Sequence, residues 1–580
     1  MNFRDKARLI AHLLRWRLRW ERRDLDYRPG PGVSDRFMTV RDAVARIPDG
    51  ATVITSGMAG NARCSAFFWA VRDRYRQEGS PAALTWLSVG AQGGRGRAPG
   101  TVEELAEPGL LARYISGHVE TAKRLLDLAE AGELAIHVLP QGEMARLIEA
   151  QSRGVTSLRS RTGVGTFLDP RVGTGAAVGQ APGEALIEPA GDRLRYRLPP
   201  IDVALVSASC ADREGNVYFK DMATLTEIRE AVRAARYNDG LALAVVQRLI
   251  EPAGDEIGVP AGELDAVCVN PWNEQSVAAW QGEPWRLFSP GGDGDDHEAI
   301  ERLRFVNRVL HITPVRGPVE TALARLGAIH FANVVPGDAH VNIGVGYPEE
   351  VCREICESPL RPAYTFTTET GVYGGIPAPG IYFGAAVNPE RQESSAWMFR
   401  FYRKGLGAAV LGLLQVDAEG NVNVSRRGPA MSDYVGPGGF PSIIEAANTV
   451  IFIGAWMAGA RWRIQDGGLR LAQPGTRKFI DQVDEITFSG PRALADGKRV
   501  YYVTHVGIIE LTPRGLQLIR LMPGIVPERD LFPHTGARIR LADDLVPVPR
   551  AVVSGRDFHL SGPAQGEPGP GSSTCTAATE

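Results

Sequence analysis

Apolar runs of strand length alternate along the chain with longer segments whose apolar residues recur at helical spacing. A capping-box-like start at residues 39–42 precedes apolar residues at 43, 44 and 47 and predicts a short helix. The segment 49–57 predicts a turn and a buried strand, and helices are expected over 66–77, 119–131 and 143–150. This alternation is typical of an open α/β layer structure.

The pattern of the first half of the chain returns in the second half. An apolar strand near 200–207 runs into a Glu-Gly-Asn-Val turn at 214–217, and one near 409–416 runs into the same turn at 419–422. The Gly-Asn dipeptide suits the backbone of a tight turn. The segment 49–57 likewise resembles 337–346. We therefore favour two duplicated α/β domains over a chance match.

Segments rich in Gly and Pro divide the chain, and its 580 residues are too many for one core. Residues 289–296 (SPGGDGDD) form the clearest linker in the body. They predict an N-terminal domain over 34–290 and a C-terminal domain over 297–556. Residues 1–33 are expected to form a basic helix and linker, and residues 557–580 a disordered tail.

The expected N-terminal helix is basic and carries aromatic residues. Residues 3–23 hold eight Arg and Lys residues around several Leu and Trp side chains, without the uninterrupted apolar core of a secretory signal. We expect the helix to pack against its own protein or to form a frayed extension, and to be dispensable for catalysis. Peripheral contact with an anionic membrane or with a partner protein is the alternative.

Composition indicates a soluble globular enzyme. Hydrophobic residues make up 44% of the chain, charged residues 23%, and a net charge of −3 gives no sign of a nucleic-acid partner. The six cysteines lack metal or disulfide spacing, as expected of a cytoplasmic protein. Cys352 and Cys356 could share a helix face, where a packing pair is favoured over a metal site. No run approaches 18 uncharged apolar residues, so no transmembrane helix is predicted.

One segment carries the strongest candidate chemistry. The β-type residues 364–368 lead directly into Glu369, and Gly371, Gly374 and Gly375 follow. Because glycine has no Cβ, such a loop lets backbone approach a ligand closely. A carboxylate there could face a substrate, although these residues alone favour a solvated Glu at a strand end. The chain shows no Gly-x-Ser-x-Gly elbow, His-Glu-x-x-His motif or Walker loop.

Several segments in one order support a more specific reading. They are TETGVYGGIPAPG at 368–380, FGAAVNP at 383–389, GLLQVDAEGNVNVS at 412–425 and GPGGF at 436–440, with 163–171 and 478–490 as further matches. Together they resemble family I CoA-transferases of the fused, single-chain type that acts on short-chain acyl groups such as acetate or propionate. The resemblance covers roughly residues 35–555. It implies two open α/β domains packed face to face, with the active site between them.

The resemblance also implies a mechanism and site residues. CoA would pass from an acyl-CoA to a free carboxylic acid by a ping-pong route through a glutamyl-CoA thioester on Glu369, with CoA as co-substrate and no permanently bound cofactor or metal. The amides of Gly438 and Gly439 and the side chain of Gln92 are expected to stabilise oxyanions. Further residues expected near CoA are Gly374, Gly375, Gly384 and Asn388.

Two other functions stay open. An acyl-CoA hydrolase on the same scaffold would differ only in whether water reaches the thioester, and a non-catalytic CoA-binding or scaffold protein would use the N-terminal helix. The chain is expected to form a homo-oligomer. The acyl donor and acceptor are not identified by the sequence, although Tyr373, beside the glycines, is expected to narrow the acyl pocket.

Overall fold

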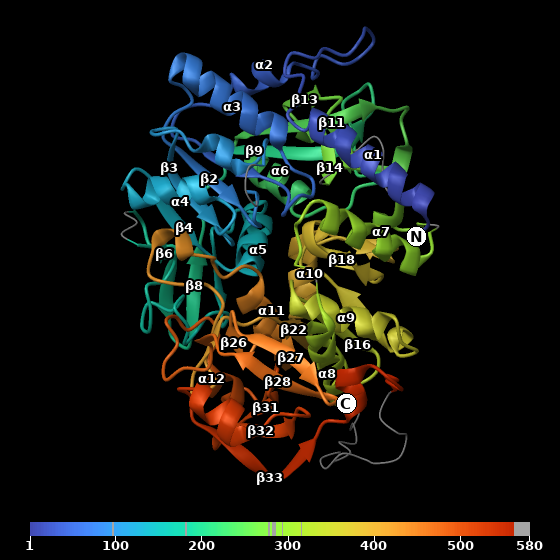
Figure 1. The fold of residues 1–580 in the computed structure, drawn as a ribbon. Helices are drawn as coiled ribbons and strands as arrows, with labels where there is room; N and C mark the ends of the chain where they lie inside the picture. Colours follow the sequence, from blue (N-terminus) through green and yellow to red (C-terminus); the bar gives the residue numbers. More distant parts are fainter. Residues whose placement is uncertain are drawn as a thin grey trace, which may run out of the picture.

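Two ten-stranded sheets, one from each half of the chain, form the centre of the molecule (Figure 1). The computed structural model describes residues 1–94, 98–179, 183–276, 279–280, 286–292, 294–314 and 316–561. Most of the predicted tail therefore lies outside the described residues. Of the predicted linker, only Asp293 lies outside the described residues. The division into domains at 290 and 297 stays a prediction.

The first sheet is mostly parallel. Its strands run in the order β12-β10-β9-β1-β2-β3-β4-β6, and β11 pairs with both β9 and β13. Their bounds are β1 (Thr52–Thr55), β2 (Leu84–Ser88), β3 (Leu111–Ser116), β4 (Ala135–Val138), β6 (Ala177–Val178), β9 (Val203–Ala211), β10 (Val217–Tyr218), β11 (Leu241–Leu249), β12 (Ile257–Val259) and β13 (Ala266–Val269). All nine residues of β9 are buried, which is typical of a parallel strand covered on both faces.

The second sheet continues from a parallel part into a mixed edge, where β30, β31 and β32 are antiparallel and β33 is parallel to β32. Its order is β21-β18-β17-β16-β22-β25-β30-β31-β32-β33. The bounds are β16 (Ala339–Ile343), β17 (Tyr364–Thr367), β18 (Val372–Tyr373), β21 (Arg391–Gln392), β22 (Leu406–Leu411), β25 (Ala447–Ile453), β30 (Arg499–Thr504), β31 (Gly507–Thr512), β32 (Gly515–Leu521) and β33 (Ile539–Pro547). Strands β17, β16, β22, β25 and β30 are parallel to one another.

The two sheets share a parallel core with the same strand order. The order β2-β1-β9-β11-β13 in the first sheet corresponds to β17-β16-β22-β25-β30 in the second. The repeated turns also share their hydrogen bonds: Asp212 accepts from the backbone and side chain of Asn216, and Asp417 does the same with Asn421. The predicted fold of two duplicated α/β units is therefore confirmed.

Helices cover both sheets, and α2, α3 and α5 begin within two residues of the predicted positions. They are α2 (Val40–Val44), α3 (Ser65–Glu78), α4 (Lys123–Glu130), α5 (Gln141–Gln151), α6 (Ile228–Tyr237), α7 (Asp296–Val309), α8 (Pro318–Val334), α9 (Tyr347–Cys356), α10 (Ser395–Tyr402), α11 (Phe440–Ala446), α12 (Gly490–Ala495) and α13 (Arg550–Ser554). Helix α4 begins four residues later than predicted. Residues before it are bound to the other half instead, since the Val119 amide donates to the Val435 carbonyl at 2.9 Å.

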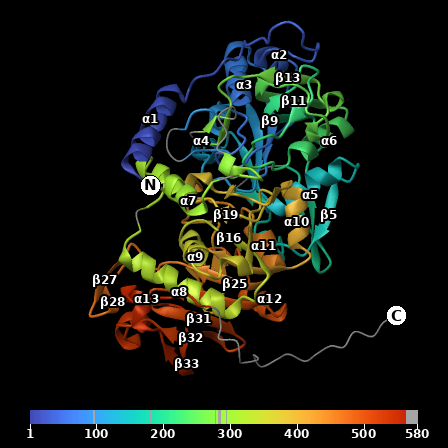
Figure 2. The ribbon, with the colours of Figure 1, turned by 90° about the vertical axis from the view of Figure 1, so that its right-hand side faces the viewer.

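The N-terminal helix α1 (Phe3–Arg19) packs against the body of the protein beside α7 (Figures 1 and 2). Leu13 and Trp16 are buried in an apolar cluster with side chains of α7 and of residues 376–387. The predicted packing of this helix on its own protein is confirmed. Among the helices in the part of the chain that the structure describes, none is long and apolar enough to cross a membrane.

Candidate active site

A cavity of about 810 Å³ lies where the carboxyl ends of the parallel strands of both halves meet. The first half contributes loops that follow β1, β2 and β3 and the start of α5, and the second contributes residues that end or follow β16, β17 and β22. Ligands of open α/β sheets bind at this edge of the strands. Glu369 is among the lining residues, so the cavity brings the predicted nucleophile together with both halves of the chain.

Glu369 lies in the tight loop between β17 and β18 and is only 6% exposed. The hydroxyl groups of Thr368 and Thr370 on either side both donate to the Gly384 carbonyl and so fix the loop. Gly371 has φ +108°, and a Cβ there would lie 1.9 Å from the carbonyl oxygen of Glu393. The loop therefore requires glycine at this position, as its sequence indicates.

The Glu369 carboxylate has one side-chain donor. Asn342, at the end of β16, donates from Nδ2 to Glu369 Oε2 at 3.3 Å and also lies 3.2 Å from the Tyr402 hydroxyl. Tyr402 in turn donates to Thr367 Oγ1 at 3.1 Å. This chain of contacts sets the position of the Asn342 amide, and through it the position of the carboxylate.

The electrostatic surroundings of Glu369 differ from those of the other acids in the cavity. Glu274 pairs with Arg63 at 2.5 Å, and Glu120 pairs with Arg427. No ion pair of Glu369 occurs within the described residues. Burial raises the pKa of Glu369 above that of an ordinary Glu, while its own backbone amide and Asn342 act in the opposite direction. Glu369 is thus a desolvated carboxylate without a neutralising cation among the described residues.

The glycine loop at 436–439 lies directly against Glu369. The Gly438 amide donates to the Gly117 carbonyl at 2.7 Å, so it is already used and does not fit the predicted oxyanion role. A Cβ on Gly439 would lie 3.6 Å from Glu369 Cγ and 3.2 Å from Gln141 Oε1. No hydrogen bond from the Gly439 amide occurs in the described part of the chain. Of the two predicted amides, Gly439 is therefore the one that remains a candidate donor.

Gln141, which the sequence did not single out, is the amide side chain that reaches this loop from the first half. It begins α5, its backbone amide donates to the Gly438 carbonyl at 3.0 Å, and its side chain lines the cavity. Its buried Oε1 has no hydrogen-bond partner among the described residues. The place of Gln141 at the site becomes visible only in the folded protein, where it follows the end of β4. No motif surrounds this residue in the sequence.

Gln92 has a different place from the predicted one. Its Nε2 lies within 2.9–3.0 Å of the carbonyl oxygens of Thr55, Ser56 and Gly57, and its Oε1 accepts from the Thr55 hydroxyl. The side chain is buried and does not line the cavity. Gln92 therefore braces the loop after β1, and it has no donor left for an oxyanion.

The residues predicted to lie near CoA also have structural places. Gly374 and Gly375 have positive φ in the turn after β18, where a Cβ on Gly375 would meet the Val387 carbonyl at 2.3 Å. Gly384 accepts hydrogen bonds from the loop that holds Glu369. Asn388 donates to the Gly294 carbonyl and to Asp296 at the start of α7. None of the four lines the cavity of Glu369.

Tyr373 does not narrow that cavity either. Its hydroxyl lies 3.0 Å from His340 Nε2, and its ring packs against Phe401. The tyrosine is absent from the residues that line the cavity. The expectation that it restricts the acyl group is therefore wrong.

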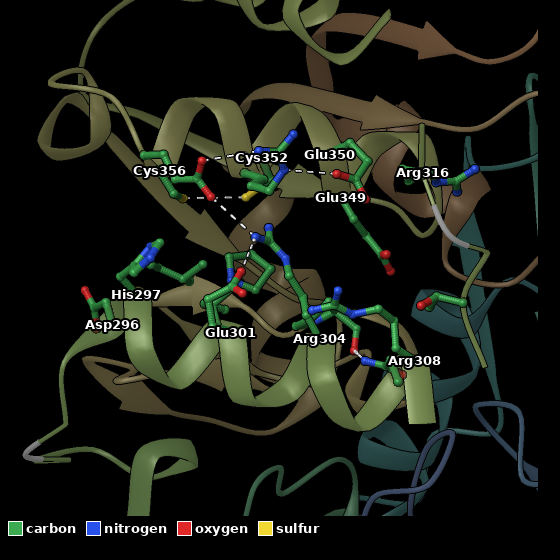
Figure 3. Close-up of a pocket in the computed structure, with 18 of the residues that line it drawn as sticks. Asp296, His297, Glu301, Arg304, Arg308, Arg316, Glu349, Glu350, Cys352 and Cys356 are labelled. Carbon is green, nitrogen blue, oxygen red and sulfur yellow. Dashed lines mark hydrogen bonds and ion pairs between the residues drawn. The ribbon is translucent and has the colours of Figure 1, made fainter. Parts of the chain in front are cut away.

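A second cavity, of about 1050 Å³, lies between α7 and α9 and does not include Glu369 (Figure 3). Its charged residues pair with one another, as Arg304 does with Glu301 and Glu357. The sulfur atoms of Cys352 and Cys356 lie 3.8 Å apart on α9, as the sequence predicted for a helix-packing pair. The contact with Cys356 and burial raise the pKa of the Cys352 thiol, which makes it a poor nucleophile.

Within the described ranges, no group of three or more His, Cys, Asp and Glu residues is arranged to hold a metal ion. The Glu369 cavity itself offers a carboxylate, backbone amides and side-chain amides. Such groups suit acyl transfer, in which negative charge develops on a carbonyl oxygen.

Comparison with known proteins shows which proteins the chain resembles. The family model described as Coenzyme A transferase matches residues 37–267. The caffeate CoA-transferase of Acetobacterium woodii is 29% identical over 523 residues, which cover 88% of this chain and 96% of that protein. The acetate CoA-transferase YdiF of Escherichia coli K12 is 29% identical over 506 residues, which cover 85% and 91% of the two chains.

The solved structures agree with the sequences. The crystal structure of the acyl-CoA transferase YdiF apoenzyme from Escherichia coli O157:H7 matches with a TM-score of 0.79 and 26% identity, over 91% of this chain and 98% of that one. The sequence and structure comparisons together support a family I CoA-transferase in which both halves are fused in a single chain. It is an enzyme that transfers CoA, and acyl-CoA and carboxylate are its classes of substrate.

Proposed function

We propose that the protein moves CoA from an acyl-CoA to a free carboxylic acid by a ping-pong mechanism, and that Glu369 is the nucleophile. The observation that carries the proposal is the state of this carboxylate: it is buried, has no ion pair within the described residues and lines a cavity shared by both halves. A carboxylate that is ionised needs no general base. Removal from water leaves its electron pairs less well solvated than those of a surface acid.

The first half-reaction has two steps. A carboxylate oxygen of Glu369 attacks the thioester carbonyl, and the C–S bond breaks to give an acyl-glutamyl anhydride and CoA thiolate. The thiolate then attacks the glutamyl carbonyl of the anhydride, which releases the donor as a free carboxylate and leaves a glutamyl-CoA thioester. The carboxylate of the acceptor acid then attacks the glutamyl-CoA thioester, the same steps run in reverse, and the acceptor leaves as the new acyl-CoA. No proton, oxidant or external energy source enters the balance.

Each addition places negative charge on a carbonyl oxygen beside Glu369. The Gly439 amide is the proposed donor to this oxyanion, because a Cβ on that residue would already contact the nucleophile. Gln141 positions the glycine loop through its backbone bond to Gly438. Asn342 holds the carboxylate by Oε2 and leaves Oε1 as the attacking oxygen.

The names of the relatives support the proposal. The structure of YdiF from Escherichia coli O157:H7 described as a thioester complex with CoA matches this chain with a TM-score of 0.78 and 26% identity. A thioester with CoA is the intermediate that the proposed mechanism requires. Acetate and caffeate, from the relatives' names, are the first acceptors to test.

Steady-state kinetics test the proposal against the hydrolase alternative. Initial rates with propionyl-CoA and acetate, varied together, are expected to give parallel double-reciprocal lines. CoA release should be slow without an acceptor, because the thioester is buried between the halves. Intersecting lines would contradict the ping-pong route. Rapid release of free CoA, with or without acetate, would show a hydrolase instead, because transfer moves CoA to acetate and releases none.

We further propose that the chain forms a homo-oligomer and that α1 is not a membrane anchor. Burial of Leu13 and Trp16 against the body of the protein supports the second statement. Light scattering on the purified protein measures the mass of the assembly, and a monomer would contradict the first. Sedimentation with anionic vesicles at low salt that is lost at high salt would contradict the second.

A further inference from the structure

The N-terminal helix α1 forms one wall of the cavity that holds Glu369. Ile10, Leu13, Leu14, Trp16, Arg17 and Trp20 all line this cavity. The helix lies outside residues 37–267, the part of the chain that matches the family model. The sequence-based expectation that the helix is dispensable for catalysis does not fit this position.

One set of side chains fixes the helix to the body of the protein. Trp16 donates from Nε1 to Glu274 Oε1 at 2.8 Å, and Glu274 also pairs with Arg63, which follows β1. The guanidinium of Arg22 lies over the ring of Trp272, 3.9 Å from its centroid. Because a buried tryptophan with a satisfied N–H is a strong anchor, α1 has a defined position over the cavity.

A second set of side chains faces the cavity and stays partly exposed. Ile10 is 40% exposed and Leu14 is 60% exposed, although both line the cavity. Further lining residues are also apolar: Val309 and Leu310 at the end of α7, and Ile381 and Phe383 beyond them. This part of the cavity thus presents carbon atoms that a ligand with an apolar body would cover.

We propose that Ile10 and Leu14 of α1 form the acyl-selecting wall, and that this wall favours carboxylic acids with a large apolar body, such as medium-chain or aromatic acids, over acetate. The proposal rests on the proposed function of the cavity and names its substrate class. Acetate carries a single methyl group and leaves such a wall uncovered, whereas a longer chain or a ring removes it from water.

The pantetheine arm of CoA fits this wall less well. It contains two amide groups, and an amide buried without a hydrogen-bond partner is unfavourable. Ile10, Leu14, Val309 and Leu310 offer no polar side-chain atoms. The acyl group, not the arm, is therefore the part of the substrate that matches the wall.

Acceptor selectivity of the full-length protein tests the proposal. With propionyl-CoA as donor, the wild type is expected to use hexanoate and 3-phenylpropionate with a higher kcat/KM than acetate. The double variant Ile10→Ala/Leu14→Ala should lower kcat/KM for the two large acids by about tenfold or more, because lost methylene contacts in a pocket have effects of this size. Its value for acetate should change by less than about twofold.

Leu18 provides a matched control. It lies four residues beyond Leu14 on the same helix, is 87% exposed and does not line the cavity. Leu18→Ala should leave all three acids unchanged, and melting curves of both variants should match that of the wild type.

Three outcomes overturn the proposal. If Ile10→Ala/Leu14→Ala lowers kcat/KM equally for all acids, α1 contacts the CoA arm and not the acyl group. If kcat/KM falls for none of them, α1 does not contact the substrate. A Leu18→Ala variant with the same selective loss would show an indirect effect of the helix. Absence of transfer to every acid in the wild type would overturn the proposed function itself, and it is seen before any variant is made.

Discussion

Each half of the protein has a polar side chain near the end of the same strand of the shared fold, yet the two side chains bind partners with different roles. In the first half, Thr55 at the end of β1 donates to Gln92, which follows the neighbouring strand β2. In the second half, Asn342 near the end of β16 donates to Glu369, which follows the neighbouring strand β17. Strands β1 and β16 hold equivalent places in the two sheets.

The difference shows how a duplicated fold divides support and chemistry. Gln92 is neutral and both donates and accepts, so it can be buried with its hydrogen bonds satisfied while it braces the loop after β1. In the proposed mechanism Glu369 is ionised and can only accept, and within the described residues it has a single side-chain donor. Under that proposal the first half supplies supporting walls, and the second half supplies the reactive group.

The largest effect is expected from loss of the acid. Glu369→Gln should reduce transfer by on the order of a thousandfold or more, because a nucleophile is removed. Glu369→Asp keeps the charge but shortens the arm, and should cost on the order of a hundredfold. Both follow from initial rates with propionyl-CoA and acetate. Transfer by Glu369→Gln at a rate near wild type would place the nucleophile elsewhere.

The melting temperature of Glu369→Gln tests the environment of the acid. The pKa of Glu369 is raised in the folded protein, so its contribution to stability is present below the unfolded pKa and is lost as pH rises through the folded pKa. Glu369→Gln should therefore melt at the same temperature as the wild type, or higher, at pH 7.5. A clearly lower melting temperature would mean that the carboxylate supports the fold.

Exchanging the acid and the amide between the two halves tests the comparison most directly. In the double variant Gln92→Glu/Glu369→Gln, the acid sits in the first half, where its oxygens would face the carbonyl groups of residues 55–57. We expect no transfer and a loss of stability of about 1–3 kcal/mol from the unmade hydrogen bonds. Initial rates and denaturant unfolding measure the two effects. Recovered activity would show that the two positions are interchangeable.

A smaller loss is expected from crowding of the nucleophile. Gly439→Ala places a methyl group 3.2 Å from Gln141 Oε1 and 3.6 Å from Glu369 Cγ, without straining the backbone. Displacement of reacting groups by about 1 Å can reduce the rate about a hundredfold, and we expect a loss of roughly tenfold to a hundredfold. Gly412→Ala is the matched control, because nothing lies within 4 Å of its added Cβ. Equal activity of the two variants would remove Gly439 from the site.

The smallest effect concerns pH. Because the ionised form of Glu369 attacks, the rate should fall as pH drops through its pKa, with a midpoint above that of an ordinary Glu. Asn342 lowers this pKa, so Asn342→Ala should move the midpoint to higher pH and reduce the rate most on the acid side. Profiles of kcat against pH for both proteins measure the shift. A shift to lower pH would contradict the assigned hydrogen bond.

The sequence predicted what local pattern and repetition determine. The strand before Glu369, the glycine that follows it and the duplicated Glu-Gly-Asn turns all have the expected structure, because each depends on neighbours in the chain. The positions of Gln141 and of helix α1 at the cavity could not be predicted in this way. Their contacts join segments hundreds of residues apart, as in the bond from Gln141 to Gly438 and the bond from Trp16 to Glu274.

Five of the predicted site residues have structural roles in the described part of the chain. Gln92, Gly374, Gly375, Gly384 and Asn388 lie near Glu369 in the chain or in a glycine-rich segment, and both features were taken as signs of ligand contact. In the structure, their backbone conformations and hydrogen bonds serve turns and braces. A glycine that avoids a clash with its own protein leaves the same sequence signal as one that approaches a ligand.

Mass spectrometry of the covalent intermediate tests the central claim most directly. The wild-type protein is incubated with propionyl-CoA without an acceptor, digested and analysed for CoA on its peptides. The mechanism predicts CoA on the peptide that contains Glu369, its discharge as acetyl-CoA when acetate is added, and no adduct in Glu369→Gln. CoA attached to another residue such as Cys352, or transfer of CoA to acetate without any adduct, would contradict the account.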